Sequence, residues 1–277
     1  MPASWRVAII CVIPQVARMY APLLRELGHD PVCVITPRRM RPGAPPTPFA
    51  ADHLDHEDPD LDVLFPSSRR SLARMLSAYD LDLGLCTTFP WRITEDAIAV
   101  PRLGIVNGHP SLLPRYRGPF PIAWAVRNGE TEIGLSYHLM DATLDTGNLL
   151  AQKPVPLEEG DTFESVLERL APVAAELLPL ALARLERGER GDRQEGGEYQ
   201  SGFGEDYLHV DPAETAEAVH RQARAWSFMP PIPGRGPILE RDGARVRLAA
   251  TSLVEVEGAE RLECADGPLW IVASEPA

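Results

Sequence analysis

The sequence predicts an α/β fold: a doubly wound, mostly parallel sheet followed by a small β barrel-like domain. In the first part of the chain, short apolar runs alternate with helical patterns, which is typical of βαβ units. The joints between these segments are short, which favours right-handed parallel connections. From residue 228 onward the helical periodicity gives way to short strand-like runs.

The first βαβ unit is the clearest. Residues 6–13 are apolar throughout, so this strand is expected to be buried on both faces of the sheet. Residues 16–27 carry apolar side chains at helical spacing and end before Gly28, a residue that commonly terminates helices. A second strand follows over 31–36. Residues 37–62 then form a long loop rich in proline and aspartate.

The pattern continues with further alternation. We expect a helix over 68–79, a strand over 81–87, a turn region over 88–94, a strand over 104–106, a helix over 121–128, and strands over 132–140 and 148–156. The longest helical pattern covers 162–187, and Pro172 and Pro179 are expected to kink or divide it. Residues 188–204 have a linker composition. A helix over 211–226 is expected to be capped by Asp211.

The C-terminal part predicts four short strands, over 238–240, 246–256, 261–264 and 269–273. Asp242-Gly243 and Asp266-Gly267 are hairpin turn signals. The expected domains are therefore a catalytic domain over 1–188, a linker and helix over 189–227, and a small β domain over 228–277.

Composition narrows the class of protein. The chain has 277 residues, 44% hydrophobic residues and a formal net charge of −13, which argues against a broad nucleic-acid surface but leaves room for a local basic patch. No apolar run approaches the roughly 18 residues of a transmembrane helix, and the N-terminal run lacks the features of a secretory signal. We expect a cytoplasmic protein. Its four cysteines lack metal-ligand spacing.

The stretch over residues 107–118 is the most informative one. Asn107 and His109 are two positions apart at the expected end of a strand, and Pro110 follows them. Side chains two apart leave a strand on the same side, so an amide donor and a titratable imidazole point at one place. Acyl transfer uses this pair, with a donor for an oxyanion and a base for a nucleophile.

A second constellation lies over residues 140–150. It places Asp145 in a turn, followed by Thr146-Gly147. A carboxylate beside an imidazole raises the basicity of the ring and orients it. Asp141 by itself is typical of a turn, and His138 is typical of a satisfied or exposed histidine. His53 and His56 lack the spacing of metal ligands.

These motifs together resemble the folate-dependent formyltransferases. The resemblance rests on Asn-x-His, Ser-Leu-Leu-Pro, Tyr-Arg-Gly and the later Leu-Asp-Thr-Gly. That family includes methionyl-tRNA formyltransferase, glycinamide ribonucleotide transformylase and nucleotide-sugar N-formyltransferases. The resemblance covers the chain to Gly188, continues faintly over 199–226, and implies a Rossmann-like catalytic domain. The terminal β domain resembles a shortened OB-like barrel.

The resemblance implies a catalytic trio of Asn107, His109 and Asp145, with 10-formyltetrahydrofolate as formyl donor. The substrate amine would attack the formyl carbon directly, without a covalent enzyme intermediate or a metal. His109 would take the amine proton or stabilise the charge that forms, and Asn107 would donate to the oxyanion. Asp145 would orient His109 and move protons through a bound water.

The resemblance also implies contacts to the donor and the substrate. The predicted donor contacts are Phe89, Pro90, Trp91, Arg92, Ile93, Asp141 and Leu144. The predicted substrate contacts are Arg115, Tyr116, Arg117 and Gly118. Two alternatives stay open: the arginines could brace their loop by ion pairs, and Trp91 could serve as a core or surface anchor.

Charge patterning guides the expected formyl acceptor. The loop opens with Arg38, Arg39 and Arg41 but turns acidic, and the arginines of the β domain are offset by glutamates. Polyanion binding normally needs a clustered positive face. We therefore expect a small-molecule amine or hydroxylamine, such as a nucleotide sugar or a biosynthetic amino compound, in one-carbon metabolism and biosynthesis.

Other classes of function stay open beside this expectation. One alternative is methionyl-tRNA formyltransferase, which would make tRNA a partner. Another is a formyltetrahydrofolate hydrolase, because water can replace the amine. A non-catalytic interaction protein is disfavoured, since it has no chemical need for the trio. We expect a monomer or homodimer without a membrane partner.

Overall fold

The computed structural model describes residues 4–40, 58, 60–229, 236–241 and 243–277. The chain divides into two compact units. The first consists of Met1–Arg117, Gly134–Val155 and Glu168–Glu198; the second consists of Gly118–Ile133, Pro156–Leu167 and Tyr199–Ala277. Some sequence-based predictions lie outside the described residues: those on Arg41, His53, His56, Asp242 and most of the 37–62 loop.

A seven-stranded sheet of order β3-β2-β1-β4-β5-β6-β7 forms the framework of the site. Its strands are β1 (Arg6–Ile10), β2 (Asp30–Ile35), β3 (Asp62–Leu64), β4 (Leu83–Thr87), β5 (Ile105–His109), β6 (Glu132–Leu139) and β7 (Leu149–Pro156). The pairs from β3 through β5 are parallel, and β6 is antiparallel to β5. The predicted mostly parallel α/β sheet is confirmed.

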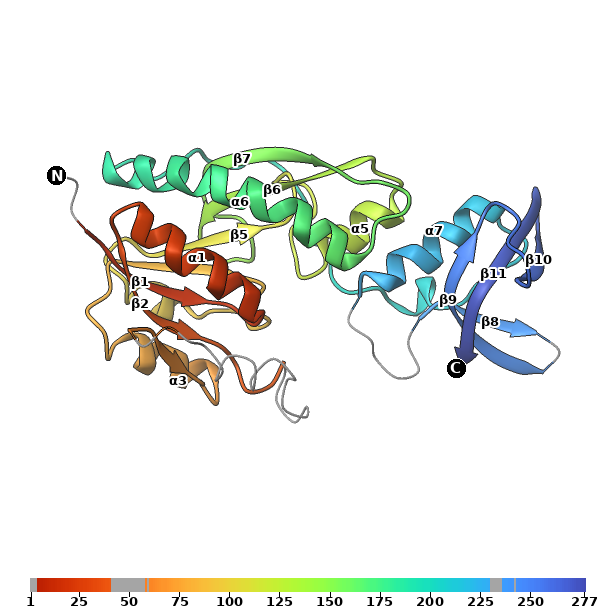
Figure 1. Ribbon diagram of the computed structural model, residues 1–277, viewed down its shortest axis with the longest axis horizontal. Helices are drawn as coiled ribbons and strands as arrows, with labels where there is room; N and C mark the ends of the chain where they lie inside the picture. The colour runs from red at the N-terminus through yellow and green to blue at the C-terminus, as the bar shows by residue number, and fades with distance from the viewer. Residues whose placement is uncertain (1–3, 41–57, 59, 230–235, 242) are drawn as a thin grey trace. The chain divides into compact units, whose positions relative to one another are not determined.

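Helices cover both faces of this sheet, as a doubly wound fold requires. The helices are α1 (Pro14–Glu26), α3 (Arg69–Leu76), α4 (Glu95–Ile98) and α6 (Phe163–Glu186). Leu72 of α3 and Ala97 of α4 pack in one cluster with Ile10 and Ile105. On the other face Tyr20 of α1 hydrogen-bonds to Tyr137 of β6. Figure 1 shows α1 in front of β1 and β2.

Several element boundaries differ from the predictions. The strand predicted to end at residue 106 continues through His109, so the two motif side chains belong to β5 itself. The short β3 and α4 were not predicted, because three or four residues carry too little periodicity. The prolines at 172 and 179 do not divide α6. Buried contacts along α6, at Leu178 and Ala181 among others, offset the backbone hydrogen bonds that proline removes.

The second unit contains α5 (Pro121–Arg127), a 3-10 turn η1 (Glu205–Tyr207), α7 (Ala216–Ser227) and an antiparallel sheet of order β10-β11-β9-β8. The strands are β8 (Ile238–Arg241), β9 (Ala244–Ser252), β10 (Glu260–Cys264) and β11 (Gly267–Pro276). The apolar face of α7, including Val219 and Ala223, packs on Leu248, Leu269 and Ile271 of the sheet. A separate C-terminal β sheet is therefore confirmed.

The start of α7 corrects a prediction. The helix begins at Ala216, and the Thr215 hydroxyl accepts a hydrogen bond from the Ala218 amide at 3.2 Å. Asp211, the predicted cap, instead accepts from the Ala213 amide in a preceding turn. Both residues are good caps by type, so only the course of the chain decides between them.

The segment with linker composition holds structural side chains. Phe203 is buried and packs edge-on against Trp124 and Trp226. Arg127 lies over the rings of Trp124 and Tyr207. In the part of the chain that is described, no helix is long and apolar enough to cross a membrane.

Candidate active site

The carboxyl end of β5 presents two polar side chains on one face. Ile105 packs in the cluster with α3 and α4, and Asn107 and His109 follow on the same side by the alternation of the strand. The antiparallel register places Asn107 directly opposite His138 on β6. Asp145, from the loop between β6 and β7, reaches both histidines. The structure therefore brings the predicted trio together and adds His138.

The tautomer of His109 follows from its surroundings. Its Nε2 lies 2.9 Å from the Tyr116 carbonyl oxygen, so Nε2 carries the proton and donates it to that oxygen. In the neutral ring Nδ1 then has the lone pair, 3.7 Å from Asp145 Oδ1. Burial lowers the pKa of His109 below 6.5, while the Asp145 charge and the Tyr116 carbonyl oppose that shift. The ring is a neutral base near pH 7.

His138 is fixed in a complementary way. Its Nδ1 donates to the Leu139 carbonyl at 3.0 Å, which leaves Nε2 as an acceptor. The Asn107 side-chain nitrogen donates to that Nε2 at 3.1 Å and lies 3.5 Å from Asp145 Oδ1. His138 thus orients the Asn107 amide. The sequence signal for it was weak, because only the pairing of β5 with β6 shows which residue faces Asn107.

The Asp145 loop has its own internal support. Asp141 Oδ1 accepts from the Thr143 amide at 3.1 Å and from the Thr146 hydroxyl at 2.7 Å. A Cβ on Gly147 would lie 1.6 Å from the Leu139 carbonyl oxygen, so only glycine lets the loop approach β6 this closely. Asp141 therefore organises the loop that carries Asp145.

Backbone strain is concentrated at this edge. Among the described residues, the non-glycine residues with left-handed φ are Thr88 at 53°, Tyr116 at 56° and Asp145 at 56°. Thr88 follows β4, Tyr116 supplies the carbonyl that binds His109, and Asp145 supplies the carboxylate. Such conformations cost free energy and tend to occur at functional sites. Their shared location supports a functional reading of this edge.

The predicted donor contacts lie on two loops of this edge. Ile93 is buried in the hydrophobic cluster, and Phe89 packs against that cluster and edge-on against Trp91. Arg92 donates to the Ala142 carbonyl at 2.6 Å and so joins the two loops. Pro90, Asp141 and Leu144 are exposed. Trp91 Nε1 donates to the Arg39 and Met40 carbonyls, each at 3.2 Å.

Two hydroxyls bear on whether a ligand fits these loops. The Thr88 and Thr94 hydroxyl oxygens bracket residues 89–93, are buried, and have no hydrogen-bond partner among the described residues. A buried hydroxyl without a partner is costly. The protein itself thus leaves hydrogen-bonding capacity unused beside residues 89–93, which fits a polar ligand such as a folate at these loops. Groups of His, Cys, Asp and Glu that could hold a metal are absent from the described residues.

The predicted substrate residues separate into exposed and internal ones. Arg115 is exposed, with its guanidinium 5.3 Å from the centroid of the Tyr116 ring. Arg117 is buried and donates to Gln194 Oε1 from two nitrogens, at 2.9 and 3.2 Å. A Cβ on Gly118, at φ 121°, would lie 2.1 Å from the Gln200 carbonyl oxygen. Gln194 carries no sequence signal, because it lies in the segment with linker composition.

Comparisons with known proteins agree with this site. Residues 2–182 match the formyl transferase family. Methionyl-tRNA formyltransferase from Sinorhizobium medicae (strain WSM419) is 31% identical over 269 residues, covering 92% of this chain and 83% of that protein. The chain therefore belongs to the formyl transferase family, and the resemblance seen in the sequence is confirmed. It is an enzyme that transfers a formyl group from 10-formyltetrahydrofolate.

Solved structures share the fold. HypX from Aquifex aeolicus in complex with tetrahydrofolic acid superposes with a TM-score of 0.69 at 17% identity, covering 99% of this chain and 44% of that one. Methionyl-tRNA formyltransferase from Clostridium thermocellum gives 0.63 at 13% identity, covering 99% of both chains. At these identities the similarity concerns the fold alone.

The expected small-molecule acceptor is wrong. Curated relatives that match this chain are methionyl-tRNA formyltransferases, which favours the alternative. The prediction relied on counting charges along the sequence. Such a count cannot show which arginines are neutralised by neighbours and which stay exposed beside the site.

Proposed function

We propose that this protein formylates the amino group of methionyl-tRNA, with Asn107, His109 and Asp145 as its catalytic residues. The observation that carries the proposal is the convergence of the Asn107 amide, the neutral His109 ring and the Asp145 carboxylate at the end of β5. The acceptor rests on the methionyl-tRNA formyltransferases that match most of the chain.

The geometry supports a direct transfer. The amine attacks the formyl carbon, and the carbonyl oxygen becomes negative as the new C–N bond forms. The Asn107 amide donates to that oxygen. His109 Nδ1 takes the amine proton, and the resulting imidazolium faces Asp145 Oδ1, which lies 3.7 Å from Nδ1. The proton then passes to the departing folate nitrogen as the C–N bond to the donor breaks.

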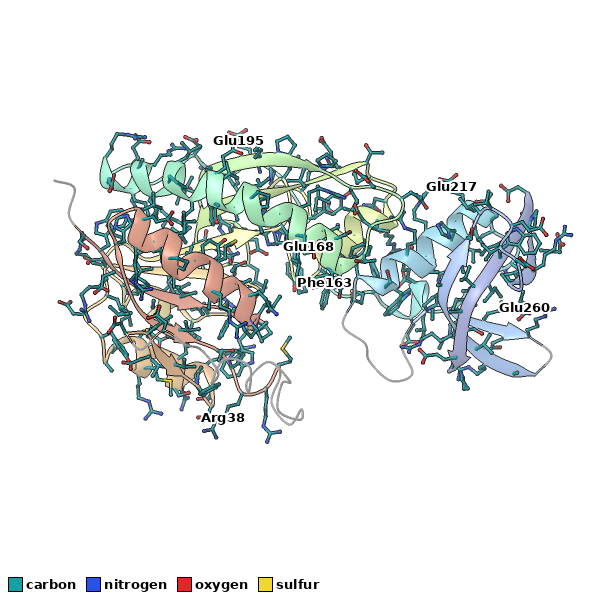
Figure 2. All side chains as sticks on the ribbon, in the orientation of Figure 1. Arg38, Phe163, Glu168, Glu195, Glu217 and Glu260 are labelled. Atoms are coloured by element: carbon teal, nitrogen blue, oxygen red, sulfur yellow. The ribbon has the colours of Figure 1, made fainter. Side chains whose placement is uncertain are left out.

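Basic side chains lie at the same edge of the sheet. Arg38 and Arg39 follow β2, whose carboxyl end shares the sheet edge with that of β5, and both are exposed; Arg38 projects from the surface in Figure 2. The indole of Trp91 holds the backbone at Arg39.

In the second unit the basic side chains are offset by acidic ones. Arg241, Arg247 and Arg261 pair with glutamates, and Glu217 and Glu260 lie on the outside of this unit (Figure 2). Phosphate contacts are therefore expected first at Arg38.

The proposal also includes the fold type of the C-terminal sheet and the cellular location of the protein. The C-terminal sheet is interpreted as a shortened OB-like barrel, supported by its four antiparallel strands. The predicted cytoplasmic location would place the enzyme where its tRNA is charged.

A formylation assay tests the proposal. Purified protein with 10-formyltetrahydrofolate should formylate methionyl-tRNA and leave small amino sugars unformylated, and its activity should fall steeply with added salt. Arg38→Ala should raise the KM for tRNA. Arg102→Ala is the matched control, because Arg102 pairs with Asp82 at the amino ends of β4 and β5, on the side of the sheet away from the site. Formate release without any tRNA product would contradict the proposal.

A further inference from the structure

Residues 191–197, here called the brace, follow the long helix α6. They pack against the loop between β6 and β7, which carries Asp145, and against the loop that follows β5. Asp192 and Leu149 exchange two backbone hydrogen bonds of 2.8 Å. Arg184 of α6 holds Asp192 by two further bonds, at 2.7 and 3.0 Å. At the other end, a Cβ on Gly197 would lie 2.2 Å from the Pro114 carbonyl oxygen. The brace therefore spans from the start of β7 to the loop that follows β5.

Gln194 lies at the centre of the brace. Its side-chain nitrogen donates to the Asp145 carbonyl at 3.0 Å and to the Gly147 carbonyl at 2.6 Å. Asp145 has the left-handed φ of 56°, a conformation that needs support from its surroundings. Two hydrogen bonds from one buried amide supply that support and fix where the Asp145 carboxylate points.

Arg117 fixes Gln194 in turn. Arg117 is 9% exposed, and its guanidinium donates twice to Gln194 Oε1 and once to the Gly197 carbonyl. This arrangement assigns the amide orientation of Gln194, because its oxygen must face the guanidinium and its nitrogen the two carbonyls. Arg117 is also the neighbour of Tyr116, whose carbonyl sets the tautomer of His109.

We propose that Gln194 and Arg117 are positioning residues for formyl transfer, which hold the Asp145 loop and the Tyr116 carbonyl at a fixed separation on either side of His109. The inference rests on the proposed catalytic roles of His109 and Asp145. It gives Arg117 an internal role and accounts for a buried guanidinium whose partners are neutral oxygens.

The discriminating variant is Gln194→Glu. It keeps an oxygen acceptor for Arg117 but places a second oxygen, instead of a donor, against the Asp145 and Gly147 carbonyls. We expect kcat to fall by up to roughly 100-fold, as a displacement of a reacting group by about 1 Å can cause. KM for donor and acceptor should change little, because neither is touched.

The second unit offers a matched control. Gln222 is also buried and also donates to two backbone carbonyls, those of Tyr207 and His209, at 2.9 and 3.0 Å. Gln222→Glu should lower the thermal unfolding midpoint at least as much as Gln194→Glu while kcat stays at the wild-type value. An equal loss of kcat in both variants, or a wild-type kcat in Gln194→Glu, would overturn the inference.

A cycle of apolar variants tests the coupling. Gln194→Met and Arg117→Met each should lower kcat, and the double variant should lose little more than Gln194→Met, because Arg117 acts on the Asp145 loop through Gln194. Fully additive losses would overturn the coupling. The readout is whichever turnover the wild type shows, with tRNA or with water as acceptor, so failure of this inference stays distinct from failure of the proposed acceptor.

Discussion

Each unit of the molecule contains a buried histidine beside a carboxylate, and the two pairs differ in how many partners the ring nitrogens have. His220 has partners at both ring nitrogens, Glu159 and Thr251, each at 2.8 Å. His109 has one close partner, the Tyr116 carbonyl, and its other nitrogen lies 3.7 Å from Asp145. A histidine with close partners at both ring nitrogens stabilises the fold. A histidine whose second nitrogen has no close partner keeps a lone pair that can accept a substrate proton. The same residue types thus serve packing in one place and, as we propose, chemistry in the other.

The largest expected effect separates the two histidines. His109→Ala should lower kcat by about 10²- to 10⁴-fold, the usual contribution of a general base. His220→Ala should lower the free energy of unfolding by about 1–3 kcal/mol, through lost hydrogen bonds, with kcat unchanged. Single-turnover assays and urea unfolding measure the two quantities. Equal kcat values for both variants would erase the distinction.

The second effect concerns the oxyanion donor. Asn107→Ala should lower kcat about 10²- to 10³-fold, as loss of one preorganised donor does. Asn148→Ala is the control, since the Asn148 amide donates to the Arg190 carbonyl at an exposed position. Steady-state kinetics at saturating donor would measure the difference. A kcat for Asn107→Ala no lower than that of the control would remove Asn107 from the catalytic residues.

The third effect is on pH dependence. His109 must be neutral to act as a base, and its pKa lies below 6.5, so kcat/KM should fall only at pH values below 6.5. The Asp145 charge raises that pKa. Asp145→Asn should therefore move the acid limb of the pH–rate profile to lower pH, besides lowering kcat. A shift to higher pH would show that His109 is not the titrating base.

The stability of the fold should also depend on the protonation of His109. Because burial lowers the pKa of His109 in the folded state, the unfolded chain binds a proton near pH 6.5 while the folded chain does not. The free energy of unfolding therefore falls as pH falls through 6.5. His109→Gln should flatten this part of the stability curve, which urea unfolding at several pH values would show.

The smallest expected effect is on the free energy of unfolding, and it concerns the pair of His220 and Glu159. Glu159 is 70% exposed although it contacts both His220 and Arg224. Glu159→Gln should therefore cost less than about 1 kcal/mol, since water and salt screen exposed ion pairs. Thermal unfolding at low and high salt would measure it. A change in kcat here would mean that the second unit affects the chemistry.

The local patterns predicted much of the first unit. Apolar runs and helical spacing placed β1, α1, β2 and β4 within a few residues of their observed bounds. The alternation of β5 alone puts Asn107 and His109 on one side of the strand. These features are local, because side-chain direction along a strand depends only on its period of two residues.

Other features depended on pairing between distant segments. The register of β5 with β6 places His138 against Asn107, and a shift by one residue would have turned it to the other face. Gln194 contacts the Asp145 loop because the chain after α6 pairs with Leu149 at the start of β7, and composition alone presented that segment as a linker. The acceptor prediction failed for a similar reason, since a sum of charges does not show that Arg241 and Arg261 are paired while Arg38 is exposed.

The sequence by itself determined the α/β class and the formyl transferase family and predicted the residues proposed to be catalytic, because these depend on residue type and short spacing. The tertiary structure alone decided the 3.7 Å gap between His109 and Asp145, the amide orientation of Asn107, and the support of the Asp145 loop by Gln194. The physical reason is that hydrogen bonds and pKa shifts depend on distances of a few tenths of an ångström between segments far apart in the chain.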